Sequence, residues 1–584
     1  RFEDGDDAYL NRTFGTPTNN KKWTYSVWMK RGNLGTNQAI MSADYDGSNY
    51  WDIRFNTSDQ IYIQNRIGAS NLLLANTTAV FRDVSAWYNI VFVFDSDNAT
   101  ASNRAILYVN GVSQTLSASP SSGDASGYNV SGEPHHIGVS RTLSSSGGIW
   151  SEFDGYQAEI NFIDGQALSA TSFGETKAGI WIPKNTSGLT FGNNGFRLKF
   201  QDSSALGDDT SGNGNDFSSN NLAATDVVLD SPTNNFATWN PLDNLQTSLF
   251  SEGNLKIGNT TGSHKQSTRS TFAVEHNFYF EFHRVDAGTR NFNVGVATAT
   301  ASISSTSNTG VYTKNYSGGA GDIIMFAYSA SANALWTGLN GTWDNSATVS
   351  EIEAGTTTNA TKTSISSEPI AAVFIDQASS YSGRIIANFG QDSSFAGTET
   401  AQGNTDDNGN GDFYYSPPSG FLALCSANLP NPGIDPAQGE EPADYFNTVL
   451  YTGNNSTQSI TGVGFQPDWL WLKNRTTGNS HALFDSVRGS GSNGFYNLST
   501  NTTNDESDST NVASLDSDGF TLGSNAGTNG NTNSLVSWNW LAGGSASSNS
   551  NGSVTSSVSV NTEAKFSIVN FQGTGSVITV GHGL

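Results

Sequence analysis

With 584 residues, the chain is too long for one hydrophobic core and favours about three to five domains of roughly 150 residues each. Hydrophobic residues make up 35% of it, with 33 Phe, 19 Tyr and 13 Trp, which excludes global disorder. The net charge of −25 disfavours nucleic-acid binding, because phosphates repel an acidic surface; solubility in salt and attraction of divalent cations are both compatible with it.

The single cysteine, Cys425, excludes an intrachain disulfide and a cysteine-based metal site. It ends an apolar run, so we expect a buried structural thiol. No run of 18 apolar residues is present to cross a membrane, and no signal peptide is visible. Because the chain starts at Arg1 without Met, we expect the native N-terminus to lie upstream.

Short alternating apolar and polar runs recur along the chain, separated by Gly, Asn, Ser and Asp. Residues 23–27, 89–94 and 105–109 are examples, and Asn110-Gly111 after the last of them is typical of a hairpin turn. Helical periodicity is nearly absent. The sequence therefore predicts an all-β protein with several antiparallel β-sandwich (jelly-roll) domains in series and little helix.

Residues 1–185 combine aromatic strands around Trp23 and Trp87 with Leu107–Gly111 (LYVNG) and a closing strand followed by Ala167–Ala170 (ALSA). As a set, these features resemble the laminin-G/concanavalin-like lectin family, which implies a β-sandwich of lectin type. Residues 186–250 resemble a connector of phage tail-fibre proteins. We expect this connector to pack between sandwiches, because its Phe and Trp side chains favour burial.

Residues 251–432 contain, in order, Asn277–Phe282, Phe292–Val296, Gly321–Tyr328, a Trp-flanked Asn-Gly turn and Ala387–Gln391. Their order and spacing resemble the SPRY family, which implies a second β-sandwich.

Proline and glutamate mark residues 433–445 as a stiff linker. Residues 446–542 are expected to form a β-rich repeat module, and the Ser/Asn/Gly-rich residues 543–559 a flexible linker. Because Phe446–Gly453 aligns with Phe566–Gly573, we expect residues 560–584 to begin a second copy of the module, so that the native chain continues.

Catalytic motifs are absent: the seven histidines form no HExxH, and neither GxSxG nor a P-loop occurs. The nearest match to a glucanase strand is Glu159-Ile-Asn-Phe-Ile-Asp164. There Asn161 stands in place of the middle carboxylate, whereas a retaining glycosidase needs a pair of carboxyls about 5 Å apart. The chain is therefore predicted not to be an enzyme.

Two acidic loops offer hard oxygen ligands at a spacing that could wrap around Ca²⁺, the one cofactor that the sequence suggests. Their candidate ligands are Asp406, Asn408, Asn410 and Asp412 in one loop, and Asp208, Asp209 and Asp216 in the other. The first departs from an EF-hand, because Pro417 stands where a bidentate Glu is needed. An ordinary acidic turn remains the alternative for both.

Aromatic residues beside Gly, Ser and Asp clusters in the first domain could stack on sugar rings at loop tips. These candidate ligand-binding residues are Tyr45, Tyr50, Trp51 and Trp150. Packing in the core is the alternative for each of them.

Taken together, the two sandwich types, the connector and the repeat modules resemble a bacteriophage tail fibre or virion appendage that recognises a host surface glycan or protein. The resemblance implies a place on the virion surface, contact with other virion proteins and a homo-oligomer, with a trimer favoured. We expect no nucleic-acid binding and no membrane insertion. A bacterial cell-surface or secreted adhesin and a glycan depolymerase are the alternatives.

Overall fold

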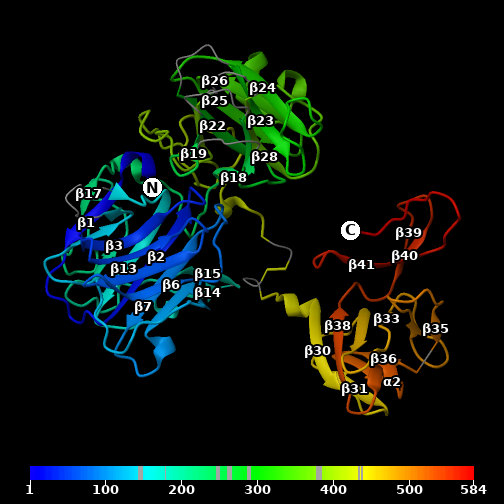
Figure 1. The fold of residues 1–584 in the computed structure, drawn as a ribbon. Coiled ribbons are helices and arrows are strands. Elements are labelled where there is room, and N and C mark those ends of the chain that lie inside the picture. The colour runs from blue at the N-terminus through cyan, green and yellow to red at the C-terminus, as the bar shows by residue number, and fades with distance from the viewer. Residues whose placement is uncertain are drawn as a thin grey trace. The chain divides into compact units, whose positions relative to one another are not determined.

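The computed structural model describes residues 1–141, 149–177, 179–244, 250–258, 266–285, 291–376, 384–431, 434–435, 439–508 and 510–584. The chain divides into two compact units, of which the first holds Arg1–Thr176 and Ile180–Leu429 and the second holds Pro430–Leu584. Figure 1 shows the first unit in blue to yellow-green and the second in yellow to red. Nearly all regular structure in both units is antiparallel strand, which confirms the predicted fold class.

A sandwich of two sheets forms the first part of unit one. The seven-stranded sheet has the order β17 (Ser218–Asn220), β1 (Tyr9–Thr13), β10 (Pro134–Ile137), β3 (Gln38–Asp46), β4 (Asn49–Phe55), β5 (Ile61–Ile67), β6 (Ser70–Asn76). The six-stranded sheet has the order β16 (Phe196–Leu198), β13 (Gly155–Asp164), β2 (Lys22–Arg31), β7 (Tyr88–Asp95), β8 (Ala105–Val109), β9 (Val112–Gln114). Two hairpins accompany these sheets, β11 (Ser140–Arg141) with β12 (Ile149–Trp150), and β14 (Gly174–Lys177) with β15 (Ile180–Pro183).

Aromatic side chains from the facing sides of both sheets fill this sandwich. Trp23 packs against Trp51 and Phe94 with ring centroids 5.3 and 5.6 Å apart, and all three side chains are fully buried. The predicted hairpin turn joins β8 to β9. Asn110 and Gly111 both adopt left-handed φ angles, 49° and 78°, as a two-residue type I′ turn requires.

The outer face of the six-stranded sheet is covered by later parts of the chain. Val91, Val93 and Ile163 on that face pack against residues 168–191, and Trp28, Trp87 and Tyr156 pack against Trp181 and Val228. Only one of the two outer sheet faces of this sandwich is therefore closed by an apolar cluster of described residues.

A second sandwich completes unit one. Its five-stranded sheet has the order β18 (Trp239–Asn244), β21 (Gln266–Ser270), β28 (Ile370–Asp376), β23 (Asn291–Thr298), β24 (Val311–Ser317). Its seven-stranded sheet has the order β19 (Phe250–Ser251), β20 (Lys256–Ile257), β29 (Ile385–Asn388), β22 (Phe278–Arg284), β25 (Ile323–Ser329), β26 (Ala334–Leu339), β27 (Thr342–Trp343). Phe280 and Phe326 stack at 4.5 Å in its core.

The buried carboxylate of Glu281 fixes a loop of the second sandwich. It accepts hydrogen bonds from the backbone N–H groups of Tyr414 and Tyr415, at 2.8 and 2.7 Å, and from the Tyr279 hydroxyl at 2.9 Å. Residues 413–415 are thereby held against β22. Burial, opposed by these donors, raises the pKa of Glu281 to about 7.

Buried charges join the connector to both sandwiches. The Lys30 ammonium group at the end of β2 donates to the Asp230 carboxylate, the Asn235 amide oxygen and the Phe236 carbonyl, at 2.7–2.8 Å. Asp230 also accepts the indole N–H of Trp87 at 3.0 Å. The side chains of Lys30 and Asp230 are at most 1% exposed, so water cannot replace these contacts.

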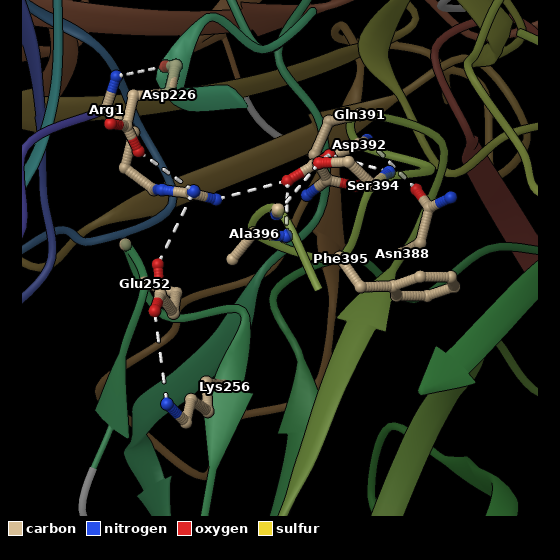
Figure 2. A network of polar contacts seen from close by, with 12 residues as sticks. Arg1, Asp226, Glu252, Lys256, Asn388, Gln391, Asp392, Ser394, Phe395 and Ala396 are labelled. Carbon is tan, nitrogen blue, oxygen red and sulfur yellow. Dashed lines mark hydrogen bonds and ion pairs between the residues drawn. The ribbon is translucent and has the colours of Figure 1, made fainter. Parts of the chain in front are cut away.

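A second buried network surrounds the Arg1 guanidinium, as Figure 2 shows. It contacts Asp226 at 3.1 Å, Glu252 at 3.4 Å and Asp392 at 3.2 Å. The Asp392 carboxylate also accepts backbone N–H groups of Ser394 and Ala396, each at 2.9 Å (Figure 2). Asp226 belongs to the connector and Asp392 to the second sandwich, so this cation links the two.

The second unit packs two further sheets face to face. The four-stranded sheet has the order β30 (Phe446–Thr452), β38 (Ser534–Trp540), β32 (Trp469–Asn474), β33 (Ala482–Asp485), and the three-stranded sheet has the order β31 (Gln458–Thr461), β37 (Gly519–Leu522), β36 (Val512–Asp516). A hairpin joins β34 (Tyr496–Asn497) and β35 (Ser507–Asp508). Leu470, Leu472, Phe484 and Phe520 form the core between the sheets.

A small third sheet ends the second unit, with the order β39 (Ser547–Asn549), β40 (Ser556–Asn561), β41 (Phe566–Phe571). Residues 543–559, whose composition predicts a flexible linker, thus contain β39 and the first residues of β40. Val558 and Ser559 there are 3% and 1% exposed, because pairing with β41 buries them. β30 pairs with β38 whereas β41 pairs with β40, so the two aligned strands occupy different sheets.

Helices are short throughout the described residues. The α-helices are α1 (Val349–Glu353) and α2 (Ala526–Asn529), and the 3₁₀ turns are Asp4–Asp6, Ala101–Asn103, Ala170–Ser172, Ala224–Asp226, Asp344–Ser346, Thr357–Asn359, Ser426–Asn428 and Pro442–Asp444. In the part of the chain that the structure describes, no helix has the length and apolar character needed to cross a membrane.

We predict that replacing Asp230 with Ala lowers the free energy of unfolding of the first unit by about 3–5 kcal/mol, because Lys30 would stay buried without its counter-charge. Urea denaturation measures this. Asp97→Ala is the control, because the Lys21–Asp97 pair has a 3.7 Å separation and both side chains are more than one third exposed. The free energy of unfolding of this control variant should fall by less than about 1 kcal/mol. Equal losses in the two variants would contradict the prediction.

Candidate functional site

The outer face of β4, β5 and β6 in the first sandwich carries polar and aromatic side chains in three cross-strand rows. Strand pairing aligns Ser42, Asp52, Gln64 and Leu74 in the middle row. The flanking rows are Tyr50 with Arg66, and Arg54 with Tyr62 and Asn76. Trp51, Ile53, Ile61 and Ile63 alternate with these residues and point into the core. Among the described residues, no apolar cluster covers this face, which we call the polar face.

Hydrogen bonds and cation–π contacts preorganise the polar face. The Tyr62 hydroxyl donates to Gln64 at 2.8 Å, and the Gln64 amide donates to Asn71 at 3.0 Å. The Arg54 guanidinium lies 4.1 Å from the centroid of the Tyr62 ring, and it also pairs with the Asp52 carboxylate. The face thus offers aromatic rings held beside amide, carboxylate and guanidinium groups, which are the groups that recognise several hydroxyls at once.

Asp52 is the electrostatically unusual residue of the polar face. Its side chain is 3% exposed, and the oxygen that does not contact Arg54 has no hydrogen-bond partner among the described residues. Burial raises the pKa of Asp52 to about 6, although the Arg54 charge opposes the shift. Asp52 therefore places an acceptor without a partner in the middle row.

The four aromatic residues that the sequence suggests as ligand-binding do not form one group. Tyr50 lies on the polar face, half-buried, with the Arg66 guanidinium 5.9 Å from its ring centroid. Trp51 is fully buried and packs on Trp23, so it is a core residue and offers no surface to a ligand. The side chains of Tyr45 in β3 and Trp150 in β12 lie outside the described part of the structure.

The loop with Asp208, Asp209 and Asp216 is held by hydrogen bonds from N–H groups. Asp209 accepts the backbone N–H groups of Arg197, Ser211 and Asn215 at 2.8–2.9 Å, and one oxygen of Asp216 accepts the Asp209 N–H at 2.9 Å. Asp208 is exposed at the rim. The carboxylate of Asp209 is therefore occupied in closing the turn.

The loop with Asp406, Asn408, Asn410 and Asp412 is likewise organised around hydrogen-bond donors. The Asp406 carboxylate accepts the backbone N–H groups of Asn408, Asn410 and Ala423, each at 2.9 Å, and the Asn428 amide at 2.7 Å. Asp412 instead accepts the Gly403 N–H at 3.0 Å. The carboxylates of Asp406 and Asp412 are therefore occupied in closing this loop, and among the described residues no group of three His, Cys, Asp or Glu side chains is placed to hold a metal ion.

The strand compared with glucanases contains no free pair of carboxyls. Asp164 is 1% exposed, and it accepts N–H groups of Thr18, Asn19, Asn129 and Asn194 at 2.7–3.1 Å. Glu159 lies at a β-bulge with a φ of 46° and pairs with Arg197 at 3.3 Å. Both carboxylates thus have structural partners.

The pKa of Asp52 predicts a pH dependence of stability. Since the folded pKa, about 6, exceeds the unfolded value of about 3.9, the stabilising effect of protonation is complete below about pH 4 and is lost as the pH rises through 6. The difference is about 3 kcal/mol. We expect Asp52→Asn to remove this component, as measured by urea denaturation at about pH 4, 5.5 and 7. An unchanged pH profile in that variant would contradict the assignment.

Comparison with known proteins identifies two family models along the chain. Residues 4–172 match the model of the Concanavalin A-like lectin/glucanases superfamily. Residues 441–584 match a domain of unknown function (DUF7483), a single model that spans both the 446–542 segment and the 560–584 segment. No curated protein matches the sequence.

Solved structures give distant likenesses. A heptameric SAP-like pentraxin from Limulus polyphemus has 16% identity over 28% of this chain and 71% of its own, with a TM-score of 0.22. The SPRY domain of human HERC1 has 13% identity over 26% and 96%, with a TM-score of 0.19. Domains LG4-5 of the mouse laminin alpha1 chain have 9% identity over 72% and 84%, with a TM-score of 0.24. At such TM-scores none of the three assigns a function, whereas the family model shows that residues 4–172 form a lectin-type domain of the concanavalin A-like kind.

Proposed function

We propose that this protein is a glycan-binding adhesive protein and that the polar face of its first sandwich is the binding surface. The observation that carries the proposal is the preorganised row of Asp52, Gln64 and the flanking Tyr62 on a sheet face of a lectin-type domain that no apolar cluster of described residues covers. The opposite sheet face of the same sandwich is covered by residues 168–191 and by the connector, so it is not accessible to a large ligand.

The chemistry of the polar face suits sugar rings. A half-buried tyrosine ring gives the apolar face of a sugar a stacking partner at low entropic cost, since its contacts already hold it in place. The Gln64 amide supplies an acceptor for hydroxyl groups and the arginines supply donors, whereas the Asp52 oxygen without a partner is buried and would have to be uncovered before it could accept a hydrogen bond from a ligand. Binding at several shallow sites on one assembly would raise the overall affinity through avidity.

We further propose that the protein is a virion appendage, such as a bacteriophage tail fibre, displayed outside the cell as a homo-oligomer, with a trimer favoured. The support is the sequence resemblance of the connector to phage fibre proteins, the SPRY-like order of motifs in the second sandwich, and a net charge of −25. Sheet edges such as the outer side of β30 could be covered by copies of the chain. A bacterial surface or secreted adhesin with the same domains is the alternative.

A non-catalytic role fits the carboxylates best. Asp164 and Glu159 both serve as structural acceptors, so a depolymerase would need a different pair. Release of oligosaccharides from a bacterial capsule by the purified protein, followed by chromatography, would refute the proposal.

We predict that Tyr62→Ala and Gln64→Ala each weaken glycan binding by about tenfold or more, because each removes a stacking or hydrogen-bonding group from the polar face. Binding is measured by glycan array and calorimetry on the full chain. Gln114→Ala on β9 is the matched control, since it removes the same side chain from the edge of the other sheet. Equal weakening in the control, or none in the test variants, would refute the site.

Immunogold labelling of purified virions with an antibody against this chain tests the appendage proposal. We expect label at tail or fibre positions and light scattering that indicates about three chains per particle of soluble protein. A chain that stays monomeric at micromolar concentration, together with unlabelled virions, would favour the adhesin alternative.

A further inference from the structure

The outer face of the four-stranded sheet in the second unit carries a block of four tryptophans. Strand pairing aligns Phe446, Trp540, Trp469 and Asp485 in one row, and Thr448, Trp538, Trp471 and Leu483 in the next. All four indoles are half-buried, so each keeps part of its surface in solvent. Leu470, Leu472 and Phe484 on the opposite face form the core. The tryptophans therefore lie outside the core between the two sheets, where they pack on one another and keep part of their surface in solvent.

Strand β41 converts one end of this face into a groove. Its Phe566 ring lies 5.6 Å from the Trp469 ring at an interplanar angle of only 9°, and 6.2 Å from Trp540 at 23°. The groove has a volume of about 350 Å³ and lies between Trp469, Leu483, Asp485, Arg488, Leu498 and residues 566–570. That volume falls in the range of about 300–1,000 Å³ typical of ligand pockets. The nearly parallel rings of Phe566 and Trp469 together form the aromatic part of the groove wall.

The charged groups at the groove, one arginine and two carboxylates, are net negative. Arg488 donates from Nε to Asp485 at 2.6 Å, from one terminal nitrogen to Glu506 at 3.3 Å, and from the other to the Leu483 carbonyl at 3.3 Å. Of its five N–H donors, these three have partners, and the other two have none among the described residues. Since two carboxylates surround this one cation, an anionic ligand would find no uncompensated positive charge.

We propose that this groove is a second carbohydrate site, specific for neutral saccharides. A sugar ring stacks on the indole of Trp469 beside Phe566, and its hydroxyl oxygens accept the two remaining N–H donors of Arg488. The ring and the donors lie in one groove, as the mixed apolar and polar surface of a sugar requires. The assignment does not depend on the polar face of the first unit, because the two surfaces share no residue.

Calorimetry on the full-length protein with cello-, xylo-, manno- and laminarihexaose tests the proposal, with an alginate hexamer as the acidic comparison. We expect at least one neutral hexasaccharide to bind, and Trp469→Ala to weaken that binding by about tenfold or more. Trp469→Phe keeps an aromatic ring, so it should lose less affinity for the sugar than Trp469→Ala does. Ser567→Trp fills the groove without removing a contact of the fold, so it should abolish binding even if Trp469→Ala is unstable.

Two control variants separate this groove from the polar face. Gln64→Ala, on the polar face, is the first control. Trp538→Ala is the second, because it removes an indole of the same sheet face that lies outside the groove. Both variants should leave the Trp469-dependent binding unchanged. The proposal is overturned if none of the four neutral sugars binds, if the alginate hexamer binds better than they do, or if binding survives Ser567→Trp. A change of oligomeric state in Trp469→Ala without any change in sugar binding would show instead that the groove is a protein interface.

Discussion

The buried ion pair between Lys30 and Asp230 determines how the first unit is arranged. Lys30 is the penultimate residue of the central strand β2, and its ammonium group binds Asp230, Asn235 and the carbonyl of Phe236, all of which belong to the connector. This holds the connector against the six-stranded sheet and closes the outer face of that sheet. Among the described residues no apolar cluster covers the other outer face of the sandwich, which is why the candidate glycan surface lies there. A buried charge pair adds little to stability, but it specifies one packing of the connector on the sheet. Any shift of the connector relative to the sheet would leave a buried charge unpaired.

The two proposed binding surfaces arise from the same structural principle with opposite chemistry. In both, alternate residues of adjacent strands leave the core and gather as rows on the free side of a sheet. On the polar face these rows combine tyrosine with amide, carboxylate and guanidinium groups that bind one another. In the second unit the rows are built mainly of tryptophans, and the charged groups Asp485 and Arg488 line the groove at one end. The first surface suits recognition through several directed hydrogen bonds, and the second suits stacking.

The fold class could be predicted from the sequence because its signals are local. Period-2 alternation and turn residues such as Asn110 and Gly111 act over a few residues, and the structure has the predicted hairpin there. The candidate binding site could be predicted only in part from the sequence. Trp51 is fully buried although its neighbour Tyr50 is not, and the alternation across residues 50–55 could have separated them. The same alternation could have brought Asp52 and Gln64 to attention.

Long-range contacts explain the remaining differences. The spacing of Asp406 and Asn410 suggests a cation, which stays a prediction, whereas the donors that hold Asp406 include Ala423 and Asn428, which no local pattern connects to it. Residues 543–559 have the composition of a linker, yet pairing with β41 places part of them in a sheet. In both cases a distant segment of the chain decides the structure.

An adhesive protein must also carry mechanical load, and the register of β2 bears on this. β2 pairs with β7 at eight consecutive positions on one side and with β13 at eight positions on the other. A tension applied along β2 through the connector at Lys30 would load these two ladders in shear, so many hydrogen bonds would have to break together rather than one after another. The strand that anchors the connector is thus also the one with the longest lateral support in its sheet. A glycan held on the opposite sheet of the sandwich would pull on this strand only through the shared aromatic core, which would distribute the force before it reached the junction.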